Sequence, residues 1–429
     1  MAFQDVVALT MGSVRAQHLW MIASGGILIL HNKYGPVVRT SPDGLSYINA
    51  PQWKEIYGHK AGQLEFSKDE KYFSGLKGEP IILNADRHYH GYIRKLFTHG
   101  FSEKAMREQE SILKEYVDLM FRRVEEEGQK GTQQIDILQW YNIFFSLAKN
   151  LAYAQMISRF PYLLRLPVAL WLIPSKVRSD AKTLNALQIE KVKHRLQTES
   201  TVPDFMDKLI TAYNSGKMSF EQLSGNSQIL IAAGSETTAT LMSGLTWLLL
   251  KNPRVLEKLA TEVRSAFSHP DEITFTGVNN CKYLLACIEE ALRAYPPSPQ
   301  PHHRIVPPGG ATVNGEFLPE GVSVSIPIYA ASNSPANWSR PGEFIPERWL
   351  GENPEFDGDK RDASQPFQIG TRGCIGRNLA YSEIKLIMAR LVWQFDIQNA
   401  TEGDWMGSQK VFMVWEKAPL WIKLQPVKR

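Results

Sequence analysis

The sequence predicts a mainly α-helical protein with a small β-rich part. After Glu103, apolar residues recur mostly at helical spacing, and residues 220–251 alone offer a helix of 32 residues. Strand-like alternation is confined to short stretches, chiefly residues 34–48 and 306–325. Because 43% of the 429 residues are hydrophobic and only 21% are charged, the chain has ample apolar surface for a large core.

Local signals support each predicted element in the first two thirds of the chain. Residues 34–48 alternate like strands around a Ser-Pro-Asp-Gly turn. The long helix at 220–251 starts with a capping-box pair, Ser219 and Gln222, and Asn252-Pro253 stops it. At 1.5 Å per residue it would span roughly 48 Å, the width of a whole domain. Residues 253–268 and 279–295 predict two further helices.

The last third of the chain begins with strands and ends with a helix. Asn314-Gly315 is a type I′ hairpin signal within the alternating stretch 306–325. Ala380, Ile384 and Leu391 recur at helical spacing directly after Cys374. Cys374 is therefore expected just before a helix N-terminus, where the helix dipole and loop N–H groups lower the pKa of a thiol.

Charge and cysteine content narrow the class of protein. A net charge of +4 without a long basic run excludes nucleic acid as the expected partner. The three cysteines form no C-x-x-C pair, which indicates an intracellular protein without disulfides. We expect one domain at residues 34–429 after an N-terminal segment at residues 1–33. The apolar stretch 19–30 is too short to span a bilayer, which needs about 20 residues, so it is either a buried or interfacial segment or the remnant of a membrane anchor.

The loop around Cys374 contains the most informative motif. The run FQIGTRGCIGRNLA places a cysteine among three glycines and two arginines. A thiolate here could serve as a nucleophile, a zinc ligand or an iron ligand. A nucleophile needs a nearby base and no His follows His303, whereas zinc needs further Cys or His residues at ligand spacing. A haem thiolate needs a single Cys, close backbone approach and basic groups for the propionates, and the loop supplies all three.

At this point the sequence resembles the cytochrome P-450 family. The loop is similar to its haem-binding signature F-x-x-G-x-R-x-C-x-G at Phe367, Gly370, Arg372, Cys374 and Gly376. The other family motifs follow in their usual order: Glu290 to Arg293 resembles E-x-x-R, FIPERW with Arg348 resembles the P-E-R segment, and AGSETT at 233–238 resembles the oxygen-binding helix. Within the family, the residue runs at 309–321 and 344–354 are most similar to those of filamentous-fungal secondary-metabolite members, such as trichothecene hydroxylases and pisatin demethylase.

The resemblance implies a cytochrome P-450 fold, a haem b cofactor and a role for each motif residue. Cys374 would be the axial ligand of the haem iron. Glu236 and Thr237 would deliver protons for oxygen activation. Glu290, Arg293 and Arg348 would lock the core behind the haem loop, which is a structural role. Around Cys374, the residues expected to contact haem or its propionates are His90, Arg94, Arg304, Phe367, Gly370, Arg372 and Gly376.

The implied activity is monooxygenation of an apolar small molecule, a fungal terpenoid or polyketide, with O2 and electrons from an NADPH-cytochrome P-450 reductase type flavoprotein. Location at the cytosolic face of the endoplasmic reticulum, with peripheral membrane contact, is also implied. Two departures stand out: the anchor is missing or abbreviated, and the roof over the substrate near residues 142–175 is short. Two alternatives stay open: a haem-binding protein with impaired turnover, and an oxygen-independent member (isomerase, dehydratase or nitric-oxide reductase).

Overall fold

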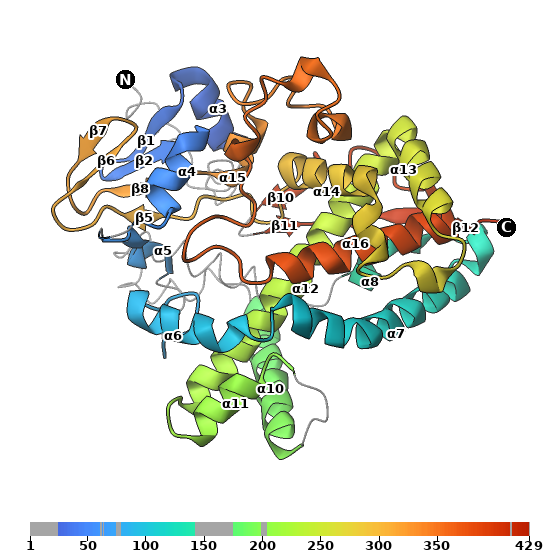
Figure 1. Cartoon of the computed structure of the whole chain (residues 1–429), viewed down its shortest axis with the longest axis horizontal. Helices are drawn as coiled ribbons and strands as arrows, with labels where there is room; N and C mark the ends of the chain where they lie inside the picture. The colour runs from blue at the N-terminus through green and yellow to red at the C-terminus, as the bar shows by residue number, and fades with distance from the viewer. Residues whose placement is uncertain are drawn as a thin grey trace.

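The computed structural model describes residues 25–60, 62, 64–73, 79–141, 175–198, 204–411 and 414–428. The strands and short helices of one side face a larger mass of long helices on the other (Figure 1). The helices are α3 (Gly25–Tyr34), α4 (Ala50–Tyr57), α5 (Glu70–Phe73), α6 (Arg87–Thr98), α7 (Glu103–Glu127), α8 (Ile137–Tyr141), α10 (Ser175–Gln197), α11 (Asp207–Asn214), α12 (Phe220–Lys251), α13 (Pro253–Ala266), α14 (Lys282–Ala294), α15 (Ile328–Asn333) and α16 (Arg377–Gln394).

In the described part of the chain, the strands are short and fall into four sheets. They are β1 (Val37–Ser41), β2 (Gly44–Tyr47), β3 (Ser67–Lys68), β4 (Ile135–Asp136), β5 (Arg304–Ile305), β6 (Ala311–Val313), β7 (Glu316–Leu318), β8 (Ser323–Ser325), β9 (Phe395–Asn399), β10 (Lys410–Val411), β11 (Trp415–Glu416) and β12 (Trp421–Pro426). The largest sheet has the order β1-β2-β8-β5-β3. Its β2–β8 pair is parallel, with Leu45 opposite Val324, and the other pairs are antiparallel. The predicted mainly helical class with a small β-rich part is confirmed.

The predicted turns of the β-rich part are confirmed. Strands β1 and β2 occupy the alternating stretch at 34–48. Strands β6 and β7 form the hairpin at Asn314-Gly315, where φ angles of 54° and 77° match a type I′ turn. A separate apolar cluster, which includes Trp53 of α4 and Val324 of β8, packs between α4 and the five-stranded sheet.

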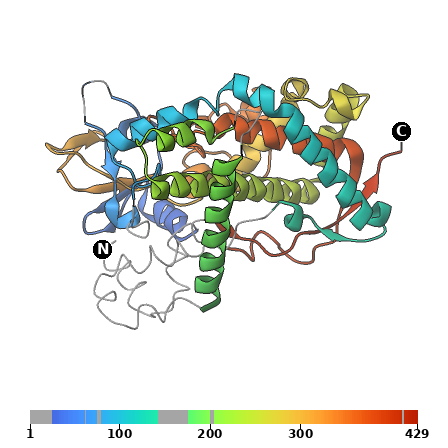
Figure 2. The same ribbon diagram turned by 90° about the horizontal axis from the view of Figure 1, so that it is seen from below.

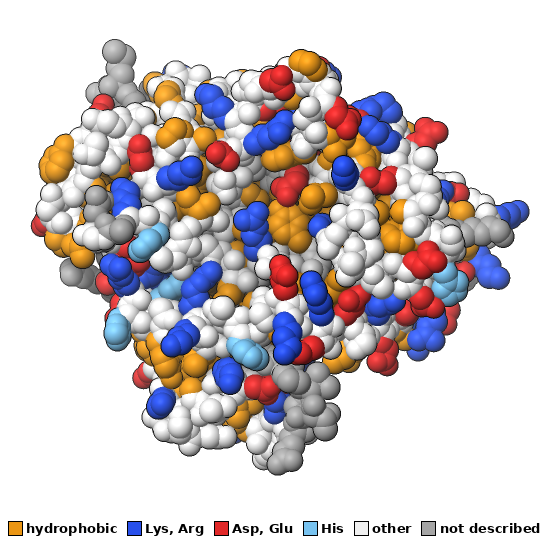
Figure 3. All heavy atoms as spheres, viewed as in Figure 1, with side chains coloured by type: hydrophobic (Ala, Val, Ile, Leu, Met, Phe, Trp, Pro, Cys, Tyr) orange, Lys and Arg blue, Asp and Glu red, His pale blue; other side chains and the backbone are white. Residues whose placement is uncertain are grey.

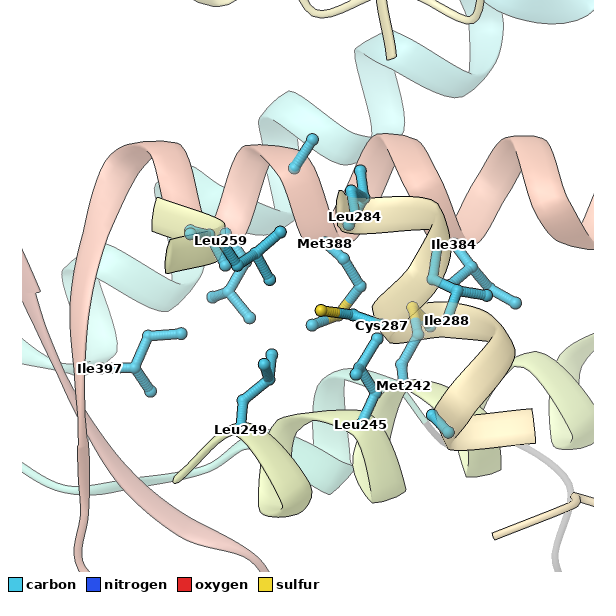
Figure 4. Packing of buried hydrophobic residues seen from close by; sticks show 14 of the residues in the cluster. Met242, Leu245, Leu249, Leu259, Leu284, Cys287, Ile288, Ile384, Met388 and Ile397 are labelled. Atoms are coloured by element: carbon cyan, nitrogen blue, oxygen red, sulfur yellow. The ribbon is translucent and has the colours of Figure 1, made fainter. Parts of the chain in front are cut away.

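The main core lies where α12, α13, α14 and α16 meet (Figure 4). Met242 and Leu245 project from α12 toward Cys287 of α14 and Met388 of α16. All four side chains are buried. At about 25 cal/mol per Å² of apolar surface removed from water, contacts of this kind are the dominant favourable term for folding. The core holds the helix that follows Cys374 firmly against α12.

Helix α12 has the predicted bounds and the predicted cap. The Ser219 hydroxyl accepts from the Gln222 N–H at 3.1 Å, and the Gln222 side chain accepts from the Ser219 N–H at 3.0 Å. Helix α10 crosses α12 steeply (Figure 2). The helices predicted at 253–268 and 279–295 exist with shorter bounds, because α13 ends at Ala266 and a 3₁₀ turn at Gly277–Asn280 precedes α14.

Within the described residues, no helix is both long enough and apolar enough to cross a membrane. Part of the apolar stretch at 19–30 lies outside them, and the rest forms the start of α3. Residues 142–174, which contain nearly all of the expected roof region, also lie outside the described part of the chain.

Candidate active site

The loop at residues 367–376 folds tightly before α16. The Cys374 N–H donates to the Phe367 carbonyl oxygen at 2.8 Å, and the Gly373 N–H donates to the Gly370 carbonyl oxygen at 3.1 Å. Gly370 has a φ of +78°, and a Cβ there would lie 1.9 Å from the Tyr57 carbonyl oxygen, so only glycine fits. Gly376 caps α16, and the Cys374 side chain is exposed at the mouth of the loop.

The thiol of Cys374 has a raised pKa, which corrects the sequence-based expectation. Although the side chain is accessible to solvent, desolvation by the surrounding atoms is the largest cause and raises the pKa, whereas the Gly376 N–H and the charges of Arg94 and Arg377 lower it. The expected help from the helix N-terminus and the arginines is therefore present but smaller than the effect of burial. Coordination to a metal cation deprotonates a thiol outright, so a bound metal would override the effect of burial at this position.

A cluster of cationic side chains lies near the loop. In the β3–β5 ladder, Lys68 stands directly opposite Arg304, a pairing of like charges that is unfavourable by itself. Burial, followed by the charges of Arg304 and Arg372, lowers the pKa of Lys68 to about 6. Burial, followed by the charges of Arg372 and Lys68, lowers the pKa of His90 to about 3. These surroundings therefore disfavour the charged forms of Lys68 and His90, and both side chains are largely uncharged near neutral pH.

Among the described residues, the members of this cluster have few acidic partners. Arg372 contacts Glu65 at 2.8 Å and donates to the Ala85 carbonyl oxygen at 3.0 Å. Arg304 is 4% exposed, and its guanidinium lies 5.3 Å from the centre of the Tyr57 ring. Arg94 of α6 donates to the Gly373 carbonyl oxygen at 2.7 Å and so ties α6 to the cysteine loop.

These residues fit haem. Its two propionates are carboxylates that would relieve the repulsion between Arg304 and Arg372 and favour the charged forms of Lys68 and His90, and its iron accepts a cysteine thiolate. The structure thus brings together His90, Arg94, Arg304 and Arg372, all predicted from the sequence, and adds Lys68 and Glu65.

The middle of α12 presents small residues and hydroxyls. Ala233 and Gly234 are exposed even though the second half of the helix is almost entirely buried. The Thr237 hydroxyl donates to the Ala233 carbonyl oxygen at 2.6 Å, the backward bond expected from the sequence. Thr238 makes the equivalent bond to Gly234 at 2.7 Å. Such bonds loosen the helix locally and leave room on this face for a small ligand.

Glu236 points into the protein and not toward the exposed face of Gly234. Its Oε1 lies 2.5 Å from Nζ of Lys417, which follows β11, and the two side chains are only 5% and 1% exposed. Lys417 also donates to the Thr240 hydroxyl at 2.6 Å. The Oε2 atom of Glu236 is buried and has no hydrogen-bond partner among the described residues.

The structure assembles the predicted trio of Glu290, Arg293 and Arg348 in the core. Glu290 contacts Arg293 at 2.8 Å and Arg348 at 3.1 Å, and all three side chains are 0% exposed. Arg348 also forms an ion pair with Asp359. The trio joins α14 to the loop at 339–349 and contains no exposed group for chemistry, so its contribution is structural.

Sequence reasoning missed Lys68, Glu65 and Lys417. All three reach their partners through contacts between segments far apart in the chain, and none belongs to a local motif. The Lys68–Arg304 register depends on strands of two residues each, which are too short to leave a periodic pattern. The only available signal was that Lys417 lies in a strongly apolar context between two tryptophans, Trp415 and Trp421.

Comparison with known proteins agrees with this geometry. A model of the cytochrome P450 family matches residues 142–420. The chain is 39% identical to cytochrome P450 monooxygenase hepD of Aspergillus oryzae, with 96% of this chain and 89% of hepD covered. It is 39% identical to cytochrome P450 monooxygenase astA of Talaromyces wortmannii (92% and 86% covered) and 37% identical to averantin hydroxylase of Dothistroma septosporum (92% and 81% covered).

Proposed function

The chain belongs to the cytochrome P450 family and is a haem-thiolate monooxygenase, and from this premise we propose that it oxidises an apolar small molecule of fungal secondary metabolism with Cys374 as the axial ligand of the iron. The observation that carries the proposal is the exposed Cys374 thiol in a loop that Arg94 ties to α6, the helix that also carries His90 of the basic cluster. A monooxygenase of this family requires O2, an organic substrate and an electron donor.

Each group around the loop has a separate task in this proposal. Cys374 binds the iron, and the Gly376 N–H tunes its sulfur. Arg304, Arg372, His90 and Lys68 hold the two propionates. When bound, haem supplies the activation of dioxygen and the oxidation itself. The protein holds the cofactor in one orientation and keeps its carboxylates charged.

Helix α12 supplies space and protons in this proposal. Gly234 has no side chain, and a Cβ added there would meet no atom within 4 Å, so a small ligand can lie against the helix. Thr237 holds a hydroxyl at this face, and the carboxylate of Glu236, one residue earlier, is paired with Lys417 inside the protein. Proton delivery by a positioned hydroxyl and carboxyl suits a reaction that consumes two protons for each dioxygen.

For the substrate we propose an apolar terpenoid or polyketide. The support is the similarity to fungal monooxygenases, one of which is named for hydroxylating averantin. A trichothecene or pisatin-like substrate is a narrower version of the same proposal, supported only by the amino-acid sequence at residues 309–321 and 344–354. We also propose location at the cytosolic face of the endoplasmic reticulum.

For the electron donor we propose an NADPH-dependent flavoprotein reductase. Arg377 is exposed beside the cysteine loop, and Lys385 lies two turns further along α16. Basic and acidic side chains are interspersed over the face that carries α16, α7 and α6 (Figure 3). Local basic groups near the cysteine would therefore determine docking, because they complement an acidic surface.

We further propose that the substrate roof is abbreviated. The alignment with hepD extends over 457 positions, more than the 429 residues of this chain, so hepD has residues without a counterpart here. A shorter roof would admit water above the iron, which diverts electrons from product. Under this proposal the protein binds haem but is poorly coupled, and insertion of a family-length segment after residue 152 raises product per electron. Efficient turnover of a bulky substrate by the present chain would contradict the abbreviated roof.

Two measurements test the main proposal. The reduced, carbon-monoxide-bound protein should have the red-shifted Soret band of thiolate ligation, Cys374→Ser should lose it and Cys281→Ser should keep it. A normal band in Cys374→Ser would overturn the assignment. With an added reductase, the monooxygenase should consume oxygen in step with a hydroxylated product, whereas a haem protein without turnover would consume electrons alone.

A further inference from the structure

Helix α7 has one face packed on the core and one face open to solvent. Its buried side chains, such as Val117 and Phe121, belong to the main core. On the open face, Ile112, Tyr116 and Leu119 are 41%, 67% and 42% exposed. The helix lies at the lower right of the molecule in Figure 1. Single exposed apolar side chains are normal on a soluble protein, whereas three together on one face indicate an interaction surface.

The three apolar side chains form a continuous stripe along the helix. Tyr116 follows Ile112 by four residues and precedes Leu119 by three, so each lies about one turn from the next. This is the spacing at which one helix packs its side chains between those of another helix. A helix with a matching stripe is therefore the partner that this face fits.

The charges beside the stripe differ at its two ends. Glu108 lies one turn before Ile112 and is exposed, whereas Arg122 and Arg123 are exposed in the turn after Leu119. A second copy of α7 that runs antiparallel places Ile112 of each copy opposite Leu119 of the other. The same arrangement brings Glu108 of each copy toward Arg122 and Arg123 of the other. The face therefore complements a reversed copy of itself.

Contacts within one chain leave these charges available. Glu108 lies 3.9 Å from Lys104, and Arg123 lies 3.2 Å from Glu126, in both cases between exposed side chains of the same helix. Solvent screens such pairs, so they compete only weakly with a partner from another molecule. A parallel copy would instead place Glu108 against Glu108 and arginine against arginine, which is repulsive.

We propose that the open face of α7 is a homodimer interface, in which two copies pair antiparallel about a two-fold axis near Glu115 and Tyr116. Such an axis uses the same patch on both molecules, which a self-complementary face allows. The contact is little more than one helix face per copy, so the interface is small, below about 1,200 Å². The dimer should be weak and reversible, with a dissociation constant of roughly micromolar order. Glu115 of both copies lies near the axis, where like charges oppose association.

Sedimentation of the purified, haem-loaded protein from about 1 to 300 μM measures the dissociation constant in the relevant range. Leu119→Glu places a charge in the middle of the contact and should raise the dissociation constant at least roughly thirtyfold, as the loss of a central interface residue does. Leu187→Glu is the matched control, because Leu187 of α10 is 49% exposed and lies outside the open face of α7. It should leave the dissociation constant unchanged, and the haem content of each variant shows that the fold is intact.

Two further variants test the antiparallel arrangement itself. Glu108→Arg should weaken the dimer, and the triple variant Glu108→Arg/Arg122→Glu/Arg123→Glu should recover it, because opposite charges face each other again. Glu115→Gln removes the repulsion near the axis and should lower the dissociation constant about two- to fivefold.

Three results would overturn the proposal. The first is a monomer over the whole concentration range, which would leave the face to a different protein. The second is an equal response to Leu119→Glu and Leu187→Glu, because association would then not depend on α7. The third is a triple variant that associates no better than Glu108→Arg, because the two helices would then not run antiparallel. Sedimentation does not depend on turnover, so the result is independent of the proposed monooxygenation.

Discussion

Replacement of Glu290 by glutamine tests how strongly the buried trio stabilises the fold. Glu290 accepts five hydrogen bonds. Its Oε1 accepts from Arg293 at 2.8 Å, from the Ile345 N–H at 3.0 Å and from Arg348 at 3.1 Å. Its Oε2 accepts from Arg293 Nε and Trp349 Nε1, both at 2.9 Å. Glutamine keeps the shape but removes the charge and turns one acceptor into a donor.

The expected loss in the free energy of unfolding follows from the number of hydrogen-bond donors that lose their acceptor. If the amide oxygen occupies the Oε1 position, the amide nitrogen faces Arg293 Nε and Trp349 Nε1, and both lose their acceptor. Each buried donor without a partner costs roughly 1–3 kcal/mol, which gives about 2–6 kcal/mol. Breaking a buried ion pair costs about 3–5 kcal/mol by a separate route. Both ranges centre near 4 kcal/mol, a large part of the roughly 5–15 kcal/mol that stabilises a folded domain.

Urea unfolding provides the assay, and the neighbouring Glu347→Gln provides the control. Glu347 also contacts two cations, Arg254 and Lys258, but its side chain is 18% exposed and theirs are 66% and 47% exposed. Because solvent screens such pairs, this control should lose only about 1 kcal/mol. Glu290→Gln should also lower the haem-loaded fraction. If the two variants differ by less than about 1 kcal/mol in the free energy of unfolding, the reasoning about the trio is wrong.

Three further predictions follow from the described contacts. Gly244→Ala places a Cβ 2.2 Å from the Tyr295 ring and should lower the free energy of unfolding by about 1–3 kcal/mol, whereas Gly91→Ala, in open space, should not. Burial raises the pKa of Glu383 to about 7 from 4.5, so the folded state binds more protons between these values. Stability should then fall as pH rises from about 4.5 to 7, and Glu383→Gln should flatten that slope in denaturation curves. Thr237→Ala should keep haem but divert electrons to peroxide, and unchanged product per electron would contradict its proposed role.

Local sequence signals predicted the elements that local forces determine. The capping box of α12, the Asn314-Gly315 hairpin and the helix after Cys374 all depend on residues within a few positions of one another, and the structure confirms them. Glu290 and Arg293 share a helix face for the same reason, since they are three residues apart.

Long-range contacts and desolvation were beyond the reach of the sequence. Lys417 meets Glu236 only because the chain returns after β11, and Lys68 meets Arg304 only through a two-residue ladder. The pKa of Cys374 was predicted in the wrong direction because the sequence reveals the nearby dipole and arginines but not the desolvation by surrounding atoms, which raises the pKa even though the side chain is accessible to solvent. The roles of the site residues, by contrast, came from the resemblance and await the experiments above.

The parallel pairing of β2 with β8 delays completion of the largest sheet during synthesis on the ribosome. Leu45 pairs with Val324, and every residue between them must be made before the two strands can meet. At about 5–20 residues per second, β1 and β2 wait roughly 15 seconds to a minute for their partner. During that time the β1–β2 hairpin has an open edge, which is a template for aggregation. Slow translation or loss of chaperones should therefore reduce the yield of this enzyme before any haem is inserted.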